Sequence, residues 1–128
     1  GLGRLDMSWH NLTSIPTNSV YEFEENAIKG TELFPPSKET TTSCAFSHIF
    51  QGGYSAGYYS YKWAEVLEAD TFELFKETGI YNKETATNFL ENILSRGGSE
   101  HPMELYKKFR GKEPSTKALL VKTGLIEG

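Results

Sequence analysis

Four side chains with the chemistry of a catalytic site fall within residues 48–61. They are His48, Tyr54, Tyr58 and Tyr61. A phenol hydroxyl is a neutral hydrogen-bond donor near pH 7, and histidine donates from its neutral or its charged ring. Several such donors converging on one point form an oxyanion site, where losing one donor costs about 3 to 4 kcal/mol of transition-state stabilisation. A structural role is the alternative, and the spacing alone favours it, because buried tyrosines commonly find partners without doing chemistry.

Three glycines lie among these residues and indicate a loop. Gly52 and Gly53 are adjacent, and Gly57 follows closely. Because glycine tolerates backbone angles closed to other residues and orders at an entropic cost, we expect a hinge or a close approach of the backbone to a ligand. The stretch is therefore predicted to be a mobile loop.

A helix is predicted to carry the tyrosines and to continue to Thr78, where Gly79 ends it. If it begins near Tyr54, then Tyr54, Tyr58 and Tyr61 lie at i, i+4 and i+7 and share one face. The opposite face, which we expect to pack into a core, carries Tyr59, Trp63, Val66 and Leu67. Two aromatic faces suggest two roles, one in the site and one in the core.

Capping signals predict further helices on both sides of this stretch, and with them an all-α fold. We expect one helix to end near His10, and another to begin at Thr17 or Asn18 and to reach Lys29 before Gly30. Residues 31–43 read as a loop and residues 44–47 as a short strand or turn. The remaining predicted helices are residues 83–95 capped by Asn82, a shorter one from Ser99 to Gly111 with Pro102 in its first turn, and a last one opened by Ser115 and ended by Gly124.

The glutamates of these helices are tempting as catalytic carboxylates, but exposure to solvent is the simpler interpretation. It applies to Glu22, Glu24, Glu25, Glu65, Glu68 and Glu73. No paired environment that would shift their pKa values can be read from the sequence. His10 is likewise expected to be structural, because nothing near it in the sequence offers a metal or base partner.

Three blocks of the sequence form long motifs. The first is His-Ile-Phe-x-Gly-Gly-Tyr-x-Ala-Gly-Tyr-Tyr-x-Tyr-x-Trp at residues 48–63, followed by Ile-Leu-Ser-Arg-Gly-Gly-Ser at 93–99 and Phe-Arg-Gly-Lys-Glu-Pro at 109–114. Together they resemble the thimet-oligopeptidase family of zinc peptidases. The resemblance runs from about Leu5 to Leu125. It implies that residues 1–128 are the C-terminal helical part of a zincin-type, neurolysin-like catalytic domain.

The resemblance also implies a role for each residue of the tyrosine stretch. Tyr61 matches the tyrosine that hydrogen-bonds the oxyanion, and His48 matches a histidine lining the same site, so both are expected to be catalytic. Tyr54 and Tyr58 match tyrosines that hold the substrate backbone. The flexible loop that closes over the peptide is matched by Gly52, Gly53 and Gly57.

Zinc is the cofactor that the family implies, and its ligands have no counterpart in this sequence. The family binds the metal through a His-Glu-x-x-His helix and a later glutamate. The only histidines here are His10, His48 and His101, and none begins such a motif. We therefore expect the zinc-binding part to lie upstream of residue 1, and residues 1–128 alone to bind no stoichiometric zinc and to lack peptidase activity.

The function that the resemblance implies is substrate binding in a zinc-dependent peptidyl-dipeptidase that hydrolyses short peptides. An oligopeptidase A-like endopeptidase is the alternative, because residues 92–99 and 102–106 also resemble that branch. A non-enzymatic helical binding module is an alternative of another class. The expected partners are peptide substrates and the missing N-terminal part of the same chain; exposed apolar faces also predict self-association.

Composition excludes several other classes of protein. The chain has 128 residues, enough for one small domain, and its 38% hydrophobic content argues against disorder. A formal net charge of −4 gives no electrostatic footprint for nucleic acid, and no apolar run is long enough to span a membrane. The single Cys44 cannot form an internal disulfide, which favours a cytoplasmic location with a periplasmic one as the alternative.

Overall fold

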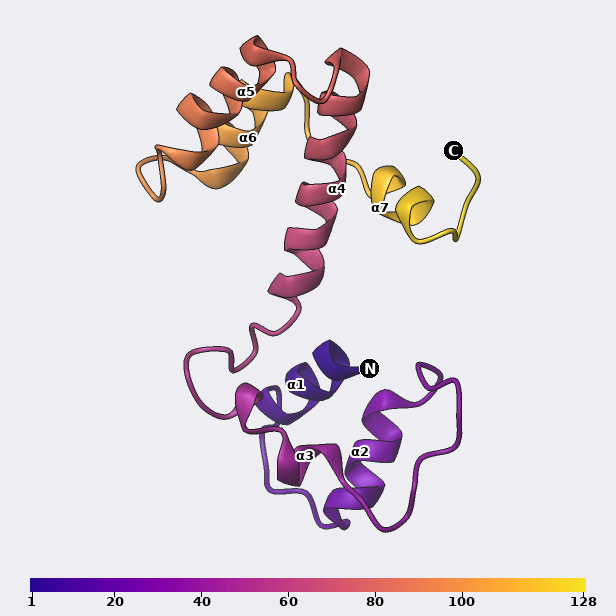
Figure 1. The fold of residues 1–128 in the computed structure, drawn as a ribbon. Coiled ribbons are helices and arrows are strands. Elements are labelled where there is room, and N and C mark those ends of the chain that lie inside the picture. The colour runs from indigo at the N-terminus through magenta and orange to yellow at the C-terminus, as the bar shows by residue number, and fades with distance from the viewer. The chain divides into compact units, whose positions relative to one another are not determined.

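The computed structural model describes residues 1–128, and all of its regular secondary structure is helical (Figure 1). This confirms the all-α prediction. The chain divides into two compact units, residues 1–61 and residues 62–128.

The first unit holds three α-helices and one 3₁₀ turn around a small core. The elements are α1 (Leu2–His10), α2 (Val20–Ile28), α3 (Thr42–Ala45) and η1 (Ser47–Ile49). Helices α1 and α2 lie side by side (Figure 1). The core is formed by Leu5 of α1, Ile28 of α2 and Ile49 of η1, with Trp9, Ala27, Phe46 and Tyr58 packed around them.

Helix α2 begins with a capping box that moves its start beyond the predicted position. Ser19 is the N-cap: its hydroxyl accepts from the backbone N–H of Glu22, and the Glu22 carboxylate accepts from the backbone N–H of Ser19. The predicted caps, Thr17 and Asn18, are therefore wrong. The Ser-x-x-Glu spacing is the signal that identifies the true start. Gly30, with φ +79°, follows the end of the helix as expected.

Glu24 is buried, so its expected exposure to solvent is wrong. Its carboxylate accepts from the backbone N–H groups of Thr42 (2.8 Å) and Ser43 (2.7 Å) and from the Ser43 hydroxyl (2.8 Å). Burial raises the pKa of Glu24, but the hydrogen bonds from Ser43 and Thr42 outweigh burial, and the pKa lies below its ordinary value. The carboxylate therefore ties α2 to the first turn of α3.

The second unit contains most of the long helix α4 (Ser60–Thr78), then α5 (Lys83–Phe89), which runs on into the π-helical turn η2 (Leu90–Leu94), then α6 (Pro102–Arg110) and α7 (Lys117–Lys122). Helix α4 ends at Thr78 as predicted, and Asn82 caps α5 by accepting from the Thr85 N–H. Gly111 ends α6 in the left-handed conformation, and Pro102 occupies its first turn, but the N-cap is His101 rather than Ser99.

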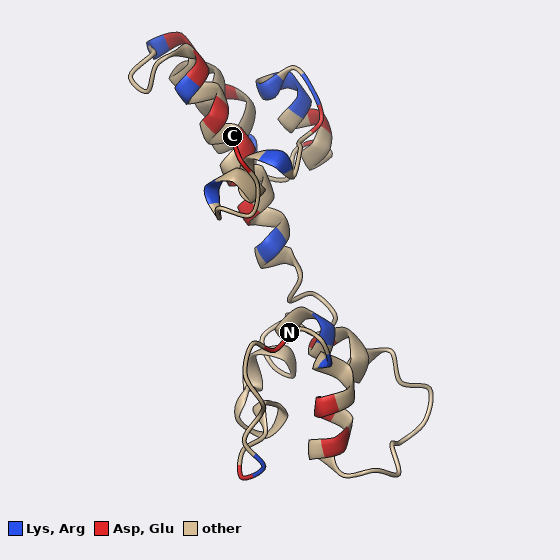
Figure 2. Ribbon diagram, turned by 90° about the vertical axis from the view of Figure 1, so that its right-hand side faces the viewer, with Lys and Arg blue, Asp and Glu red and all other residues tan.

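Residues of both charge signs are distributed over the second unit (Figure 2). Of the six glutamates expected at the surface, the three in this unit each pair with a lysine: Glu65 with Lys62, Glu73 with Lys76 and Glu68 with Lys122. Exposed pairs of this kind contribute about 0 to 1 kcal/mol each, so they have little influence on stability.

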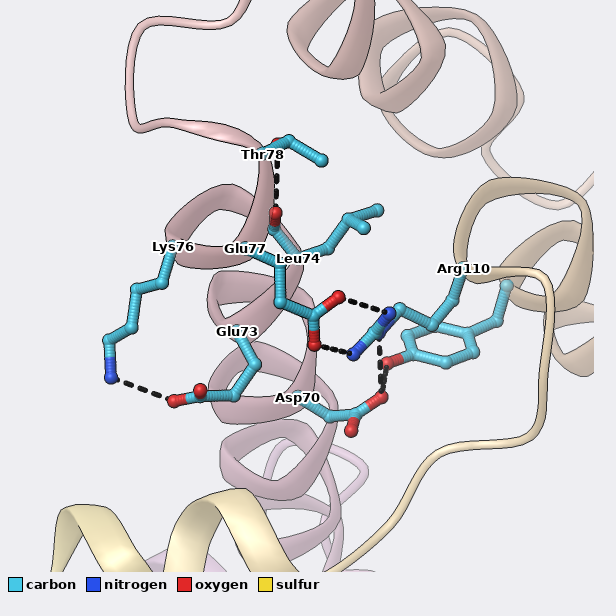
Figure 3. Close-up of polar contacts among 8 residues, drawn as sticks. Asp70, Glu73, Leu74, Lys76, Glu77, Thr78 and Arg110 are labelled. Atoms are coloured by element: carbon cyan, nitrogen blue, oxygen red, sulfur yellow. Dashed lines mark hydrogen bonds and ion pairs between the residues drawn. The ribbon is translucent and has the colours of Figure 1, made fainter. Parts of the chain in front are cut away.

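The interior of the second unit combines aromatic packing with one buried polar network. Phe89 packs against Phe75 and Phe109 with ring centroids 5.9 and 5.2 Å away. Asp70 of α4 accepts from the Tyr106 hydroxyl of α6 at 2.5 Å and lies 3.4 Å from Nε of Arg110. The Arg110 guanidinium also binds Glu77 through both terminal nitrogens (Figure 3). This network fastens α6 to α4.

An apolar cavity of about 500 Å³ opens in the second unit, with α4, α5, η2 and α6 contributing to its walls. Its aromatic wall is formed by Trp63, Phe72, Phe75, Phe89 and Tyr106. None of the predicted site residues lines it. No helix of the chain combines the length and the hydropathy needed to cross a bilayer.

Candidate active site

The structure brings the four predicted donors together within the first unit. Nε2 of His48 lies 3.1 Å from the Tyr61 hydroxyl, within hydrogen-bond distance. The His48 ring is 4.5 Å from the ring of Tyr54, 5.5 Å from Tyr58 and 5.8 Å from Tyr61, measured between centroids. Tyr54 stacks on Tyr61 at 5.6 Å, and Tyr58 lies 5.0 Å from Tyr61. Three phenols therefore surround one imidazole.

The backbone structure that positions the tyrosines differs from the predicted helix. Helix α4 begins at Ser60, not near Tyr54, so Tyr54 and Tyr58 lie in turns and the shared helical face does not exist. The Gly57 N–H donates to the Tyr54 carbonyl, and the Ser60 N–H donates to the Gly57 carbonyl. These consecutive turns, rather than helical spacing, bring the tyrosine side chains together. Tyr59, predicted to enter a core, is 61% exposed.

The glycines of the loop differ in what they do. Gly52 and Gly53 both have positive φ, +74° and +82°, a region that favours glycine. A Cβ on Gly53 would meet no atom within 4 Å, so conformation rather than space requires glycine there. Gly57 has no positive φ, but a Cβ on it would lie 3.5 Å from the Tyr54 carbonyl oxygen. The predicted mobility of this loop stays a prediction.

His48 is held from both sides of the turn that carries it. It lies in η1, next to Ile49, which is fully buried in the core. The Phe46 ring packs 5.6 Å from the imidazole. From the tyrosine loop, the Ser55 hydroxyl donates to the Ile49 carbonyl at 2.8 Å, which joins the loop to η1. The histidine and the tyrosines are thus parts of one connected segment.

Asp6 is a residue of this site that the sequence interpretation missed. Its side chain is fully buried, and its two carboxylate oxygens accept from the backbone N–H groups of Ala56 and Tyr58, each at 2.9 Å. His10 Nδ1 lies 2.8 Å from both the Asp6 carbonyl oxygen and Oδ1. Because a carbonyl oxygen only accepts, Nδ1 is the protonated nitrogen. A structural role for His10 therefore fits its contacts.

Tyr61 remains accessible and protonated in this environment. Its side chain is 42% exposed, and that of Tyr54 is 37% exposed. The pKa of the Tyr61 hydroxyl is raised above its ordinary value of 10.0, first by a side-chain hydrogen bond with Tyr54, then by desolvation and by the charge that Tyr54 or Tyr58 carries when ionised. At neutral pH the phenol is therefore a hydrogen-bond donor that an incoming group can reach.

The side chains of the chain do not fit a zinc site. No three His, Cys, Asp or Glu residues lie close enough together to hold a metal ion. His48 is surrounded by phenol rings rather than by further metal ligands. The cluster offers aromatic rings and hydrogen-bond donors, which suit the binding of a developing oxyanion or a peptide backbone.

Comparison with known proteins identifies the family. Residues 2–125 match the model of Peptidase family M3, and the chain belongs to this family. It is 64% identical over 81 residues to oligopeptidase A of Escherichia coli strain K12, a match that covers 63% of this chain and 12% of that protein. It is 46% identical over 112 residues to a probable cytosolic oligopeptidase A of Arabidopsis thaliana, covering 84% of this chain and 16% of that protein.

A second kind of relative matches more of the chain at lower identity. The dipeptidyl carboxypeptidase of Salmonella typhimurium strain LT2 is 40% identical over 127 residues, which is 98% of this chain and 19% of that protein. The chain thus spans less than a fifth of the length of the relatives it matches. Peptide hydrolysis is the activity common to the names of these relatives.

Proposed function

We propose that the protein carrying this chain is a zinc-dependent peptidase of short peptides, and that residues 48–61 form the part of its active site that binds the peptide and the oxyanion. The observation that carries the proposal is the contact between His48 Nε2 and the Tyr61 hydroxyl, inside a ring of tyrosines. Membership of Peptidase family M3 supports the reaction class. Zinc ligands would have to come from residues other than these.

The hydrogen-bond chemistry of the pair defines the catalytic roles. If His48 carries its proton on Nε2, it donates to the Tyr61 oxygen and leaves the Tyr61 proton free. Tyr61 then donates to the oxyanion of the tetrahedral intermediate, and His48 strengthens that donor by polarising it. Tyr54 and Tyr58 present further hydroxyls and ring faces to the backbone of the bound peptide.

Two cleavage patterns are candidates, and different matches favour each. The higher identity to oligopeptidase A favours cleavage within the peptide. The match over nearly the whole chain favours the release of C-terminal dipeptides, as in a peptidyl-dipeptidase. Peptides with a free or an amidated C-terminus separate them, since only removal of dipeptides requires the terminal carboxylate. A cytoplasmic location stays a prediction.

The test of the proposed site is the variant Tyr61→Phe in the whole protein. Loss of an oxyanion donor should lower kcat by about 100-fold or more while KM and the fold change little, because the interaction forms mainly in the transition state. The measurement is steady-state cleavage of an internally quenched short peptide, with product masses determined in parallel.

Tyr59→Phe is the matched control. Tyr59 is exposed and takes no part in the contacts around His48, so its hydroxyl should be nearly dispensable. Equal, small effects of the two substitutions would return Tyr61 to a structural role. A wild-type protein without zinc or peptidase activity would favour the non-enzymatic binding module instead.

A further inference from the structure

The backbone of the tyrosine loop is held by a single side chain from a distant part of the sequence. Asp6 of α1 reaches across 50 residues to Ala56 and 52 residues to Tyr58. We propose that Asp6 is the positioning residue of this site: its carboxylate fixes the turn at residues 56–58 so that Tyr58 and Tyr61 close around His48. The proposal rests on the proposed function for its catalytic consequence.

The turn contains a backbone conformation that is unfavourable for its residue. Ala56 has φ +56°, and it is the only residue other than glycine with a positive φ. A side chain with a Cβ disfavours this conformation. Strained backbone persists only where surrounding interactions impose it. Here the Ala56 N–H donates to Asp6 Oδ1, and the Tyr58 N–H, two residues on, donates to Oδ2.

Only a carboxylate satisfies this pair of donors. Both of its oxygens accept, whereas an asparagine in the same place would turn its NH₂ group toward one of the two backbone N–H groups. That N–H would then lose its acceptor at a partly buried place. Asp6 itself is fixed in α1, since its neighbour Leu5 is fully buried in the core and His10 Nδ1 contacts Oδ1. The anchor is therefore rigid.

Tyr58 is the residue that connects Asp6 to the rings around His48. Its ring packs against the core and lies 5.5 Å from His48 and 5.0 Å from Tyr61. The Tyr61 N–H also donates to the Tyr58 carbonyl at 3.3 Å, where α4 begins. A shift of the Tyr58 backbone therefore moves the rings of Tyr58 and Tyr61, two of the three that surround the imidazole, and Asp6 acts on them through the Tyr58 backbone N–H.

The test is Asp6→Asn in the whole protein, with Asp70→Asn as the matched control. Asp70 is a buried aspartate of the second unit whose partners are Tyr106 and Arg110, so the control removes the same charge from a structural network. Two readouts are measured. One is hydrogen–deuterium exchange of peptides covering residues 54–61, and the other is KM and kcat with a short quenched peptide.

The expected result is specific to Asp6. Exchange of residues 54–61 should become at least about tenfold faster in Asp6→Asn and stay unchanged in Asp70→Asn, because only Asp6 accepts hydrogen bonds from backbone N–H groups of this stretch. The folded Asp6→Asn enzyme should show KM and kcat both impaired, with kcat/KM lower by about tenfold or more, since small misplacements are costly. Asp70→Asn should lose thermal stability while its KM and kcat stay those of the wild type.

Two results would overturn the proposal. Unchanged exchange at residues 54–61 in Asp6→Asn would show that another contact holds the turn, and faster exchange with wild-type KM and kcat would make Asp6 merely structural. If the wild-type protein cleaves no peptide, the proposed function fails, and exchange alone decides whether Asp6 positions the tyrosines. If Asp6→Asn does not fold, His10→Ala is the second variant, because it removes one donor to the Asp6 carboxylate. Exchange of residues 54–61 should then be faster, and kcat/KM lower, by about twofold. The absence of both changes would count against the proposal.

Discussion

Each unit of this molecule contains one buried aspartate, and the two are used in opposite ways. Asp6, in the first unit, accepts from two backbone N–H groups of an irregular turn. Asp70, in the second unit, accepts from the Tyr106 hydroxyl and faces Arg110, both side chains of helix α6. One carboxylate shapes a backbone, and the other joins two helices.

The difference separates a residue that serves a site from one that serves stability. Helices α4 and α6 satisfy their own backbones, so Asp70 adds only cohesion between them. Residues 54–58 have no helix to satisfy theirs, and a conformation with a positive φ at Ala56 requires an outside acceptor. Removing each carboxylate should therefore have different consequences.

The largest effect on stability is expected for Asp70→Ala. The substitution leaves the Tyr106 hydroxyl and Arg110 Nε buried without their partner, and Arg110 Nε already lacks a hydrogen bond. Breaking a buried pair by removing one partner costs about 3 to 5 kcal/mol. Urea unfolding followed by circular dichroism measures the loss.

The exposed pairs of the same unit are the control. Glu68→Ala breaks only the surface contact with Lys122, which should change the unfolding free energy by less than about 1 kcal/mol. Similar losses for Asp70→Ala and Glu68→Ala would show that the buried network contributes no more than a surface pair.

Local signals made the second unit the easier one to predict. Thr78 before Gly79, Asn82 before α5, Pro102 in the first turn of α6 and Gly111 after it lie within a few residues of the boundaries they set. A cap acts through its own helix, so a pattern in the sequence suffices to find it. The exact N-caps of two helices of this unit differ from the predicted ones by one or two residues: His101 replaces Ser99 before α6, and Thr116 replaces Ser115 before α7.

Partners far apart in sequence explain the errors in the first unit. Glu24 is buried because Thr42 and Ser43, 18 and 19 residues away, supply its donors. The helix does not begin near Tyr54 because Asp6, 50 residues before Ala56, holds a turn there. The candidate site residues could still be proposed from the sequence, since the family resemblance depends on residue types rather than on a helical face, and their catalytic roles stay predictions.

Two opposite substitutions within the tyrosine loop, glycine to alanine and alanine to glycine, should have smaller effects. Gly53→Ala places a Cβ at φ +82° in open space, so it adds only backbone strain of about 1 kcal/mol, or about fivefold in an equilibrium. We expect it to raise KM and lower kcat together, as hinge substitutions do. Steady-state kinetics with the quenched peptide measures both.

Ala56→Gly is the counterpart of Gly53→Ala. Glycine relieves the strain at φ +56°, and the gain is offset in part by the greater freedom of glycine in the unfolded chain. Stability should therefore change by less than about 1 kcal/mol. A loss of stability as large as that of Gly53→Ala would show that the Ala56 methyl group makes a contact that outweighs its strain.

The smallest effects should appear as opposite responses of the two units to pH. The folded-state pKa of Glu24 lies below 4.5, its ordinary value, so its stabilising contribution is present above pH 4.5 and is lost as pH falls below it. Burial, and then the hydrogen bond to Asp70, raise the pKa of Tyr106 above 10.0, so its contribution is present below pH 10.0 and is lost as pH rises beyond it. The first unit should therefore weaken in acid and the second in alkali.

Each unit contains one tryptophan, which allows the two responses to be measured separately. Trp9 donates to the Ser43 hydroxyl beside Glu24, so its fluorescence in a Trp63→Phe background reports unfolding of the first unit. Trp63 in a Trp9→Phe background reports the second unit. Glu24→Gln should flatten the acid response of Trp9, and Tyr106→Phe the alkaline response of Trp63, because each removes the group that titrates. If the stability of the first unit falls with pH as steeply in Glu24→Gln as in the wild type, another carboxylate causes the acid response. Asp6 would then be the next residue to substitute.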